Sequence, residues 1–99
     1  MDSQLPDRWK GLSARQRDIL LTLVVEGAMP GAELHERIGG VDGRRADSEL
    51  YQDLKRLRED GLVECREEDW RTNEYEVTGE GRSAVYRAGQ AWRGVIPGA

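Results

Sequence analysis

Three polar side chains recur along one face of a segment whose pattern predicts a helix over residues 44–60. Ser48, Gln52 and Lys55 stand at i, i+4 and i+7, so a helix brings them to the same side. Hydroxyl, amide and ammonium groups can exchange hydrogen bonds with base edges in the DNA major groove. These three residues are therefore the candidates for base reading.

Cations and one tyrosine surround that face and continue beyond it. Guanidinium and phenol groups donate to phosphate oxygens, and such contacts set the register of a protein on DNA without reading its sequence. The candidates for contacts with the DNA backbone are Arg44, Arg45, Tyr51, Arg56 and Arg71. A solvated amphipathic helix explains the same charge pattern without DNA, because residues 44–58 carry a net charge of only +2 and residues 59–69 carry −5.

The elements around these residues follow from apolar periodicity. Leu50, Leu54 and Leu57 form a narrow stripe that anchors the helix over 44–60, and Gly61 suits the left-handed turn that ends it. Alternating residues predict strands over 62–66 and 73–78, joined by a polar hairpin loop over 67–72.

Two helices are expected before this unit. Ser13 is a good N-cap with Gln16 three residues later, as in a capping box, and Gly27 ends the helix. Pro30 suits the first turn of a short second helix over about 31–38. Residues 39–43 hold three glycines, but without a preceding strand and a Gly-Lys-Ser/Thr ending they predict a connector and no nucleotide loop.

A last helix is predicted over residues 79–93, capped by Thr78, with an alanine-rich stripe that lets another helix approach closely. We expect it to form a dimer contact with the N-terminal arm. The residues assigned to that contact are Trp9, Val85, Ala88 and Trp92; the alternative for the tryptophans is packing of the arm on the last helix within one chain. The expected organisation is an arm over 1–11, a DNA-binding domain over 12–78, a dimerisation helix over 79–93 and a flexible tail over 94–99.

Composition bounds the class of protein. Ninety-nine residues allow one domain with a modest core, and no apolar run reaches the roughly 20 residues that cross a bilayer. A single cysteine, Cys65, excludes an internal disulfide and fits a reducing cytoplasm. The net charge of −4 is unusual for a nucleic-acid binder. Abundant acids with only two lysines are typical of salt-adapted proteins, although a GC-rich genome also favours arginine.

The expected order is helix, bridge, helix, helix, strand, loop, strand, helix, which makes an α+β, mostly α winged helix-turn-helix with a three-helix core, a two-stranded wing and a C-terminal helix. In such folds the third helix enters the major groove. Several stretches resemble the PadR-like family of winged-helix transcriptional regulators, and in particular its short, haloarchaeal-type members. The resemblance covers residues 12–93 and is most specific in Leu50-Tyr51-x-x-Leu54-x-x-Leu57 followed by Gly61-Leu62-Val63-Glu64.

The resemblance implies a homodimer that binds a roughly palindromic operator, usually as a repressor, with Tyr51 at the DNA surface. Two departures stand out. Residues 67–72 hold three consecutive acids and no glycine, whereas the wing of many members contains glycine and arginine. The chain also has one C-terminal helix where longer members have several.

Other chemistry finds little support. His35 has no second His or Cys at ligand spacing, and we interpret Cys65 as a small buried hydrophobe, with an intersubunit redox disulfide as the less favoured alternative. Because no catalytic constellation, metal cluster or cofactor motif is recognisable, we expect no enzyme, no cofactor and no metal. The leading prediction is a cytoplasmic, dimeric DNA-binding regulator with no membrane segment. Any effector is unknown. The alternative is a winged-helix module that binds protein, in which acidic neighbours neutralise the arginines of 44–58.

Overall fold

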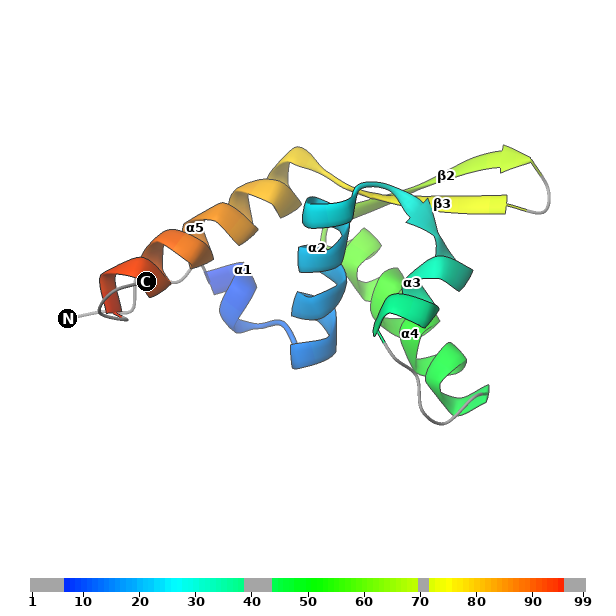
Figure 1. Cartoon of the computed structure of the whole chain (residues 1–99), viewed down its shortest axis with the longest axis horizontal. Coiled ribbons are helices and arrows are strands. Elements are labelled where there is room, and N and C mark those ends of the chain that lie inside the picture. Colours follow the sequence, from blue (N-terminus) through cyan, green and yellow to red (C-terminus); the bar gives the residue numbers. More distant parts are fainter. Residues whose placement is uncertain (1–6, 39–43, 70–71, 96–99) are drawn as a thin grey trace.

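The computed structural model describes the backbone of residues 7–38, 44–69 and 72–95, and the side chains of residues 9–38, 49–66 and 73–91. The elements in chain order are α1 (Asp7–Lys10), α2 (Ala14–Glu26), β1 (Met29–Pro30), α3 (Gly31–Ile38), α4 (Arg44–Glu59), β2 (Val63–Asp69), β3 (Thr72–Val77) and α5 (Gly79–Val95). Helices α2, α3 and α4 pack together, β2 and β3 project from them as a hairpin, and α5 extends in the opposite direction (Figure 1). The arrangement confirms the winged helix-turn-helix predicted from the sequence.

The expected helix ends are present. The Ser13 hydroxyl accepts a hydrogen bond from the Gln16 amide at 3.2 Å, and the Gln16 side chain accepts one from the Ser13 amide at 3.0 Å, which completes the capping box of α2. Gly27 follows the last turn of α2 with φ 93°, and Gly61 turns the chain after α4 with φ 75°. Both conformations favour glycine because a Cβ atom would be strained there.

The predicted bridge is present as the two-residue strand β1, and the wing hairpin is longer than the sequence indicates. Its three antiparallel strands lie in the order β1-β3-β2, with Met29 opposite Tyr75 and Cys65 opposite Tyr75 on the other side. The prediction of a loop over 67–72 was wrong in extent, because β2 continues to Asp69 and β3 begins at Thr72, past an irregularity between Glu67 and Asp69. Ladder hydrogen bonds use the backbone, so a run of acids can remain paired where its side chains do not need burial.

The core is continuous through all the helices. It includes the Leu50, Leu54 and Leu57 stripe of α4, together with Ile19 and Leu20 of α2, all at most 2% exposed. These residues lie in one cluster, which confirms the apolar stripes of α2 and α4.

The N-terminal arm contains a short helix, α1, that no periodicity in the sequence indicates. Trp9, in α1, is 1% exposed and belongs to the core cluster. The Arg17 guanidinium lies 5.5 Å from the centre of its indole ring and donates from Nε to the Trp9 carbonyl at 3.2 Å. In Figure 1 α1 lies beside α5, so this described part of the arm packs within its own chain.

Three polypeptide segments meet where α5 begins. The Thr78 hydroxyl donates to the Gly61 carbonyl at 2.7 Å and accepts from the Gly81 amide at 3.0 Å. The Thr78 amide donates to the Leu62 carbonyl at 3.0 Å. Thr78 thus caps α5, as predicted, and also joins it to the turn after α4. Helix α5 ends at Val95, two residues beyond the predicted end, so residues 94 and 95 belong to the helix; the remainder of the expected tail lies outside the described residues.

Candidate nucleic-acid interface

Helix α4 is held by its leucines with one flank toward α2 and another toward the wing. On the α2 flank, Arg15 forms ion pairs with Glu49 at 2.8 Å and with Asp53 at 3.7 Å. The Gln16 amide nitrogen also donates to Asp53 at 3.2 Å. These contacts join α4 to α2, and they occupy the acids of this flank within the chain.

The flank of α4 that faces the wing has a different character. Tyr51, Lys55 and Arg58 stand at i, i+4 and i+7, and all three are exposed. Neither Lys55 nor Arg58 has an ion pair among the residues whose side chains are described. This flank therefore offers donors that no carboxylate in the described part of the chain already uses.

The ion-pair pattern separates Arg58 from other arginines of the winged helix. Arg15, Arg37 and Arg66 pair with carboxylates at 2.7–2.8 Å, and Arg56 pairs more loosely with Asp60 at 3.4 Å. Such exposed pairs add little stability, but they reduce the charge that is open to a ligand. Arg58 was not among the residues assigned from the sequence, although its spacing from Tyr51 and Lys55 could have indicated it.

Tyr51 lies against the first residue of α3. A Cβ atom on Gly31 would stand 3.0 Å from the Tyr51 hydroxyl and 3.1 Å from Cε1, so the ring packs closely on the glycine backbone. Half of the Tyr51 side chain remains exposed, at 49%. The contact holds the phenol between α4 and the first residue of α3. It also leaves the phenol open to a ligand, as a contact with the DNA backbone requires.

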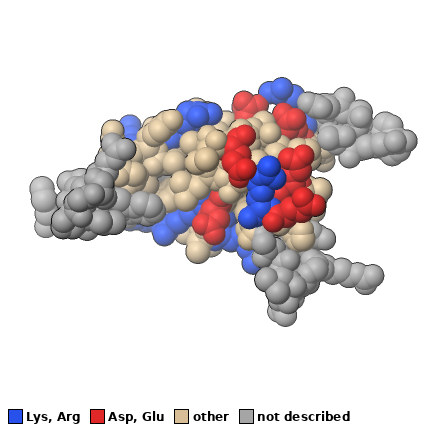
Figure 2. Space-filling model, viewed as in Figure 1, with Lys and Arg blue, Asp and Glu red and all other residues tan. Residues whose placement is uncertain are grey.

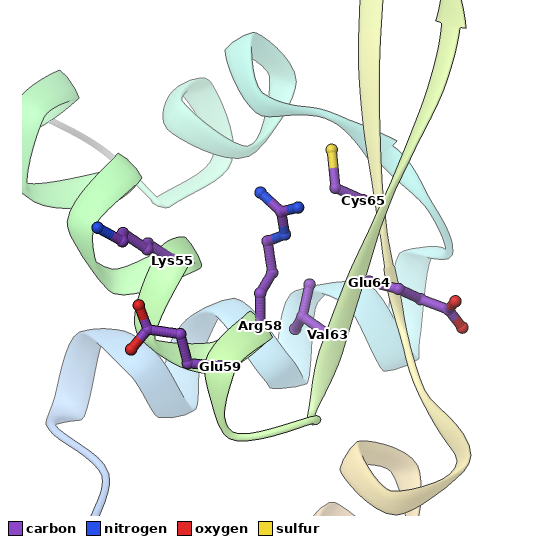
Figure 3. A pocket seen from close by; sticks show the side chains of 6 residues that line it. All are labelled: Lys55, Arg58, Glu59, Val63, Glu64 and Cys65. Atoms are coloured by element: carbon purple, nitrogen blue, oxygen red, sulfur yellow. The ribbon is translucent and has the colours of Figure 1, made fainter.

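A hollow of about 500 Å³ separates the C-terminal half of α4 from β2. Its lining residues are Lys55, Arg58, Glu59, Val63, Glu64 and Cys65. Figure 3 shows the Arg58 side chain extending from α4 into the space in front of Cys65, whereas the carboxylate of Glu64 points away to the far side of the strands. Cys65 is half-buried, more open than the sequence suggested, although it does pack against the core.

Tyr75 lies on β3 directly opposite Cys65, which lines this hollow. Burial raises the pKa of Tyr75, and the neighbouring Cys65 and Tyr51 raise that pKa further, whereas the positive charge of Arg58 lowers it. The tyrosine therefore keeps its proton to a higher pH than a free tyrosine does.

The remaining predicted base and backbone contacts divide by what is described. Gln52 is exposed on α4 beside Tyr51, as expected. Arg44, Arg45 and Ser48 lie on α4 by their backbone, but their side chains are outside the described residues, as is all of Arg71. Arg56 lies on the flank of α4 away from the wing and is paired with Asp60, so it is less available than the sequence indicated.

Charge over the rest of the surface is mixed. On the face drawn in Figure 2, Asp and Glu gather in the right half with Lys and Arg among them, and uncharged residues cover much of the area of α2 and α5. No group of three metal-ligand side chains occurs within the described residues. None of their helices is long and apolar enough to cross a membrane.

The residues assigned to a dimer contact are largely covered by their own chain. Trp9, Val85 and Ala88 are 1%, 9% and 1% exposed, which favours the intrachain alternative for Trp9. The side chain of Trp92 is outside the described residues. An apolar groove of about 480 Å³ lies between α2 and α5, and its walls include Val25 and Tyr86, which are 77% and 58% exposed. Participation of the four assigned residues in a dimer stays a prediction.

Comparison with known families decides the class. The model of the transcriptional regulator PadR-like family matches residues 20–87, which include α3, α4, the wing and the first half of α5. The chain belongs to the PadR-like family of transcriptional regulators. The family assignment predicted from the Leu50–Leu57 segment and Gly61-Leu62-Val63-Glu64 is thereby confirmed.

Solved structures agree with the PadR-like assignment. The complex named hsRosR-S4 is 32% identical, with a TM-score of 0.80, and the match covers 91% of this chain and 78% of that one. A structure of H. salinarum RosR, described as grown from NaBr, is also 32% identical, with a TM-score of 0.76. The match covers 91% of this chain and 82% of that one. A transcriptional regulator from Thermotoga maritima, 24% identical, shares the fold with a TM-score of 0.75 over 90% of this chain and 61% of that one. No curated protein matches the sequence significantly.

Proposed function

We propose that this PadR-like protein is a sequence-specific DNA-binding regulator that presents α4 to the major groove and represses transcription by occupying a promoter. The observation that carries the proposal is the wing-facing flank of α4, where Tyr51, Lys55 and Arg58 are exposed and the two cations have no ion pair among the described side chains. Gln52 supplies an exposed amide beside them. In a winged helix-turn-helix the third helix of the core docks in the major groove, and here that helix is α4.

Ser48, Gln52 and Lys55 are the proposed base-reading residues. Arg44, Arg45, Tyr51, Arg56 and Arg71 are the proposed backbone contacts, with Arg56 weakened by its pair with Asp60. The net charge of −4 argues for few phosphate contacts and for more reliance on hydrogen bonds and shape. Each phosphate contact adds about −0.9 to the slope of log affinity against log salt, so we expect a shallow slope, suited to a salt-rich cytoplasm.

The direct test is fluorescence anisotropy of a labelled duplex taken from upstream of the protein's own gene, titrated from low to molar potassium chloride with an unrelated duplex as competitor. We expect preference for the upstream duplex, and loss of that preference in Gln52→Ala and Lys55→Ala. Lys10→Ala is a matched control, because Lys10 is the only other lysine and lies exposed on α1. Equal affinity for both duplexes at every salt concentration, or equal effects of Lys10→Ala and Lys55→Ala, would contradict the proposal.

We also propose that two copies pair through α5 and the arm, so that the two α4 helices lie about 34 Å apart on successive turns of DNA. The exposed apolar residues Val25 and Tyr86 on the groove between α2 and α5 support this face. Tyr86→Glu should shift the protein to the monomer in sedimentation equilibrium, whereas Ser83→Glu, an equal change at an exposed site of α5, should not. A dimer that survives both Tyr86→Glu and Val25→Glu would place the contact elsewhere.

One observation favours a second function, binding of a protein partner. Arg56 is neutralised by Asp60, as that alternative predicts for the cations of α4. Lys55 and Arg58 do not follow the same pattern within the described residues. Absence of duplex binding together with capture of a defined protein through the Tyr51 face would establish this alternative.

A further inference from the structure

We propose that the hollow between α4 and β2 is a seat for one phosphate of the DNA backbone, with Arg58 as its principal donor and Lys55 at its rim. The inference rests on the proposed DNA binding and adds to it a residue and a site that were not predicted from the sequence. In this proposal the DNA backbone is held at the place where α4 approaches strand β2 of the wing.

The first support is the state of the guanidinium. Arg58 is exposed, and it is the one arginine with a described side chain between Ala14 and Val77 that has neither a carboxylate nor a backbone carbonyl as a partner within the described residues. Arg17, for comparison, donates to the carbonyls of Trp9 and Lys10. A planar group with five donors suits phosphate oxygens and binds them more strongly than neutral donors do.

The second support is the shape of the site. The hollow holds about 500 Å³ and is open to solvent along the groove between α4 and β2, so a phosphate carried by a duplex can enter it. Arg58 extends into this space from one wall, and Cys65 faces it from the other (Figure 3). The opposite wall presents Val63 and the Cys65 thiol to the guanidinium. Glu64 also lines the hollow, but its carboxylate points away to the far side of the strands (Figure 3).

The third support is the alignment of Arg58 with the proposed interface. Tyr51, Lys55 and Arg58 follow one line along α4 and reach successive positions of a ligand that runs past the helix. Glu59 also lines the hollow and opposes an anion there. Removal of that charge should therefore strengthen binding, a sign opposite to the loss of Arg58.

The salt dependence of duplex binding tests the seat. Arg58→Gln should weaken binding about tenfold or more at low salt, as expected for loss of a charged hydrogen bond, and should reduce the salt slope by about 0.9. Arg58→Lys keeps the charge and should restore the slope. Glu59→Gln should tighten binding. The matched control is Arg87→Gln, which removes an equal charge from an exposed position on α5, and thermal melting confirms that each variant is folded.

Cys65 provides a readout that needs no substitution. It is the single cysteine of the chain, so the rate of its alkylation by N-ethylmaleimide reports only on the hollow. A saturating duplex should slow that reaction severalfold in the wild type and in Arg87→Gln. An unrelated duplex at low salt should protect as well, because a phosphate contact does not depend on sequence.

The outcomes separate the two proposals. A wild type that binds DNA, with equal salt slopes for Arg58→Gln and Arg87→Gln or with Cys65 unprotected, would overturn the phosphate seat and leave the regulator intact. A wild type that binds neither duplex at any salt would overturn the regulator and the seat together. A reduced slope in Arg58→Gln alone, with protection of Cys65, would establish the phosphate seat, whereas preference for the upstream duplex is what would establish the regulator.

Discussion

Replacement of Gly81 by alanine tests how α5 is attached to the winged helix. Gly81 is buried in the first turn of α5, and a Cβ atom there would overlap the Leu62 carbonyl oxygen and approach Val77 Cγ2 to 2.7 Å. Val77 is a buried, β-branched side chain with restricted rotamers, so its methyl can yield only in part. The Leu62 carbonyl has less freedom, because it accepts the Thr78 amide at 3.0 Å and follows the turn at Gly61.

The expected magnitude follows from three opposing terms. Alanine in a helix is favoured over glycine by up to about 1 kcal/mol, and less in the first turn. Overpacking against a rigid neighbour costs about 1–3 kcal/mol, and displacement of the Leu62 carbonyl would weaken a hydrogen bond worth about 1 kcal/mol. We therefore expect Gly81→Ala to lower the free energy of unfolding by about 2 kcal/mol, which corresponds to a fall in Tm of about 10 °C for a chain of this size.

Gly79→Ala is the matched control, because a Cβ atom on Gly79 would meet nothing within 4 Å. Urea denaturation at one fixed protein concentration measures both variants, since dimerisation would make the midpoint depend on concentration. The control should be as stable as the wild type or slightly more so. A Gly81→Ala protein as stable as Gly79→Ala would show that the Leu62 backbone yields easily, and the tight attachment of α5 inferred from the structure would be refuted.

Two further predictions concern stability. Ser13→Ala removes the hydroxyl that accepts the Gln16 amide, and should cost about 1 kcal/mol in urea denaturation, whereas Ser83→Ala, at an exposed site within α5, should be nearly neutral; equal effects would contradict the capping argument. The pKa of Tyr75 is raised in the folded protein by burial, so the folded state holds its proton above pH 10 where the unfolded chain, with a pKa of about 10, releases it. The contribution of the neutral, buried Tyr75 to the free energy of unfolding is complete below pH 10, and it is lost as the pH rises from 10 through the folded-state pKa. Tyr75→Phe should flatten this alkaline loss, and Tyr86→Phe, on exposed α5, should keep it; two identical pH profiles would count against a buried, neutral Tyr75.

The sequence predicted the elements whose signals are local. The bounds of α3, the capping box of α2 and the turns at Gly27 and Gly61 depend on neighbouring residues, and all were found as expected. The leucine stripe of α4 also depends only on helical spacing. Helix α1 could not be predicted in this way, because four residues carry no period and its burial depends on α5, which is distant in the sequence.

The sequence predicted which residues lie on the candidate interface better than it predicted which of their charges are left unpaired by other side chains. Exposure of Tyr51, Gln52 and Lys55 follows from their positions opposite the leucines. The i,i+4 spacing of Arg56 and Asp60 could have indicated their ion pair. The lack of a carboxylate partner for Arg58 among the described side chains depends on the geometry between α4 and β2, which spacing alone does not contain. The length of the wing was likewise hidden, because its ladder is made by the backbone while its side chains are acidic.

The contacts of Thr78 with the turn after α4 and with the first turn of α5 bear on the spacing of the two DNA half-sites that a dimer would bind. The Thr78 hydroxyl joins the turn after α4 to the start of α5, and the packing of α5 on α1 and α2 adds to this attachment. In a dimer built through α5, this junction would therefore help to set the angle between the two winged helices. The chain is 47 Å along its longest axis, so a rotation of a few degrees between α5 and the winged helix would move the far end of each protomer by several ångströms. In such a dimer, the geometry at Thr78 would influence the distance between the two α4 helices, and with it the number of base pairs between the two half-sites.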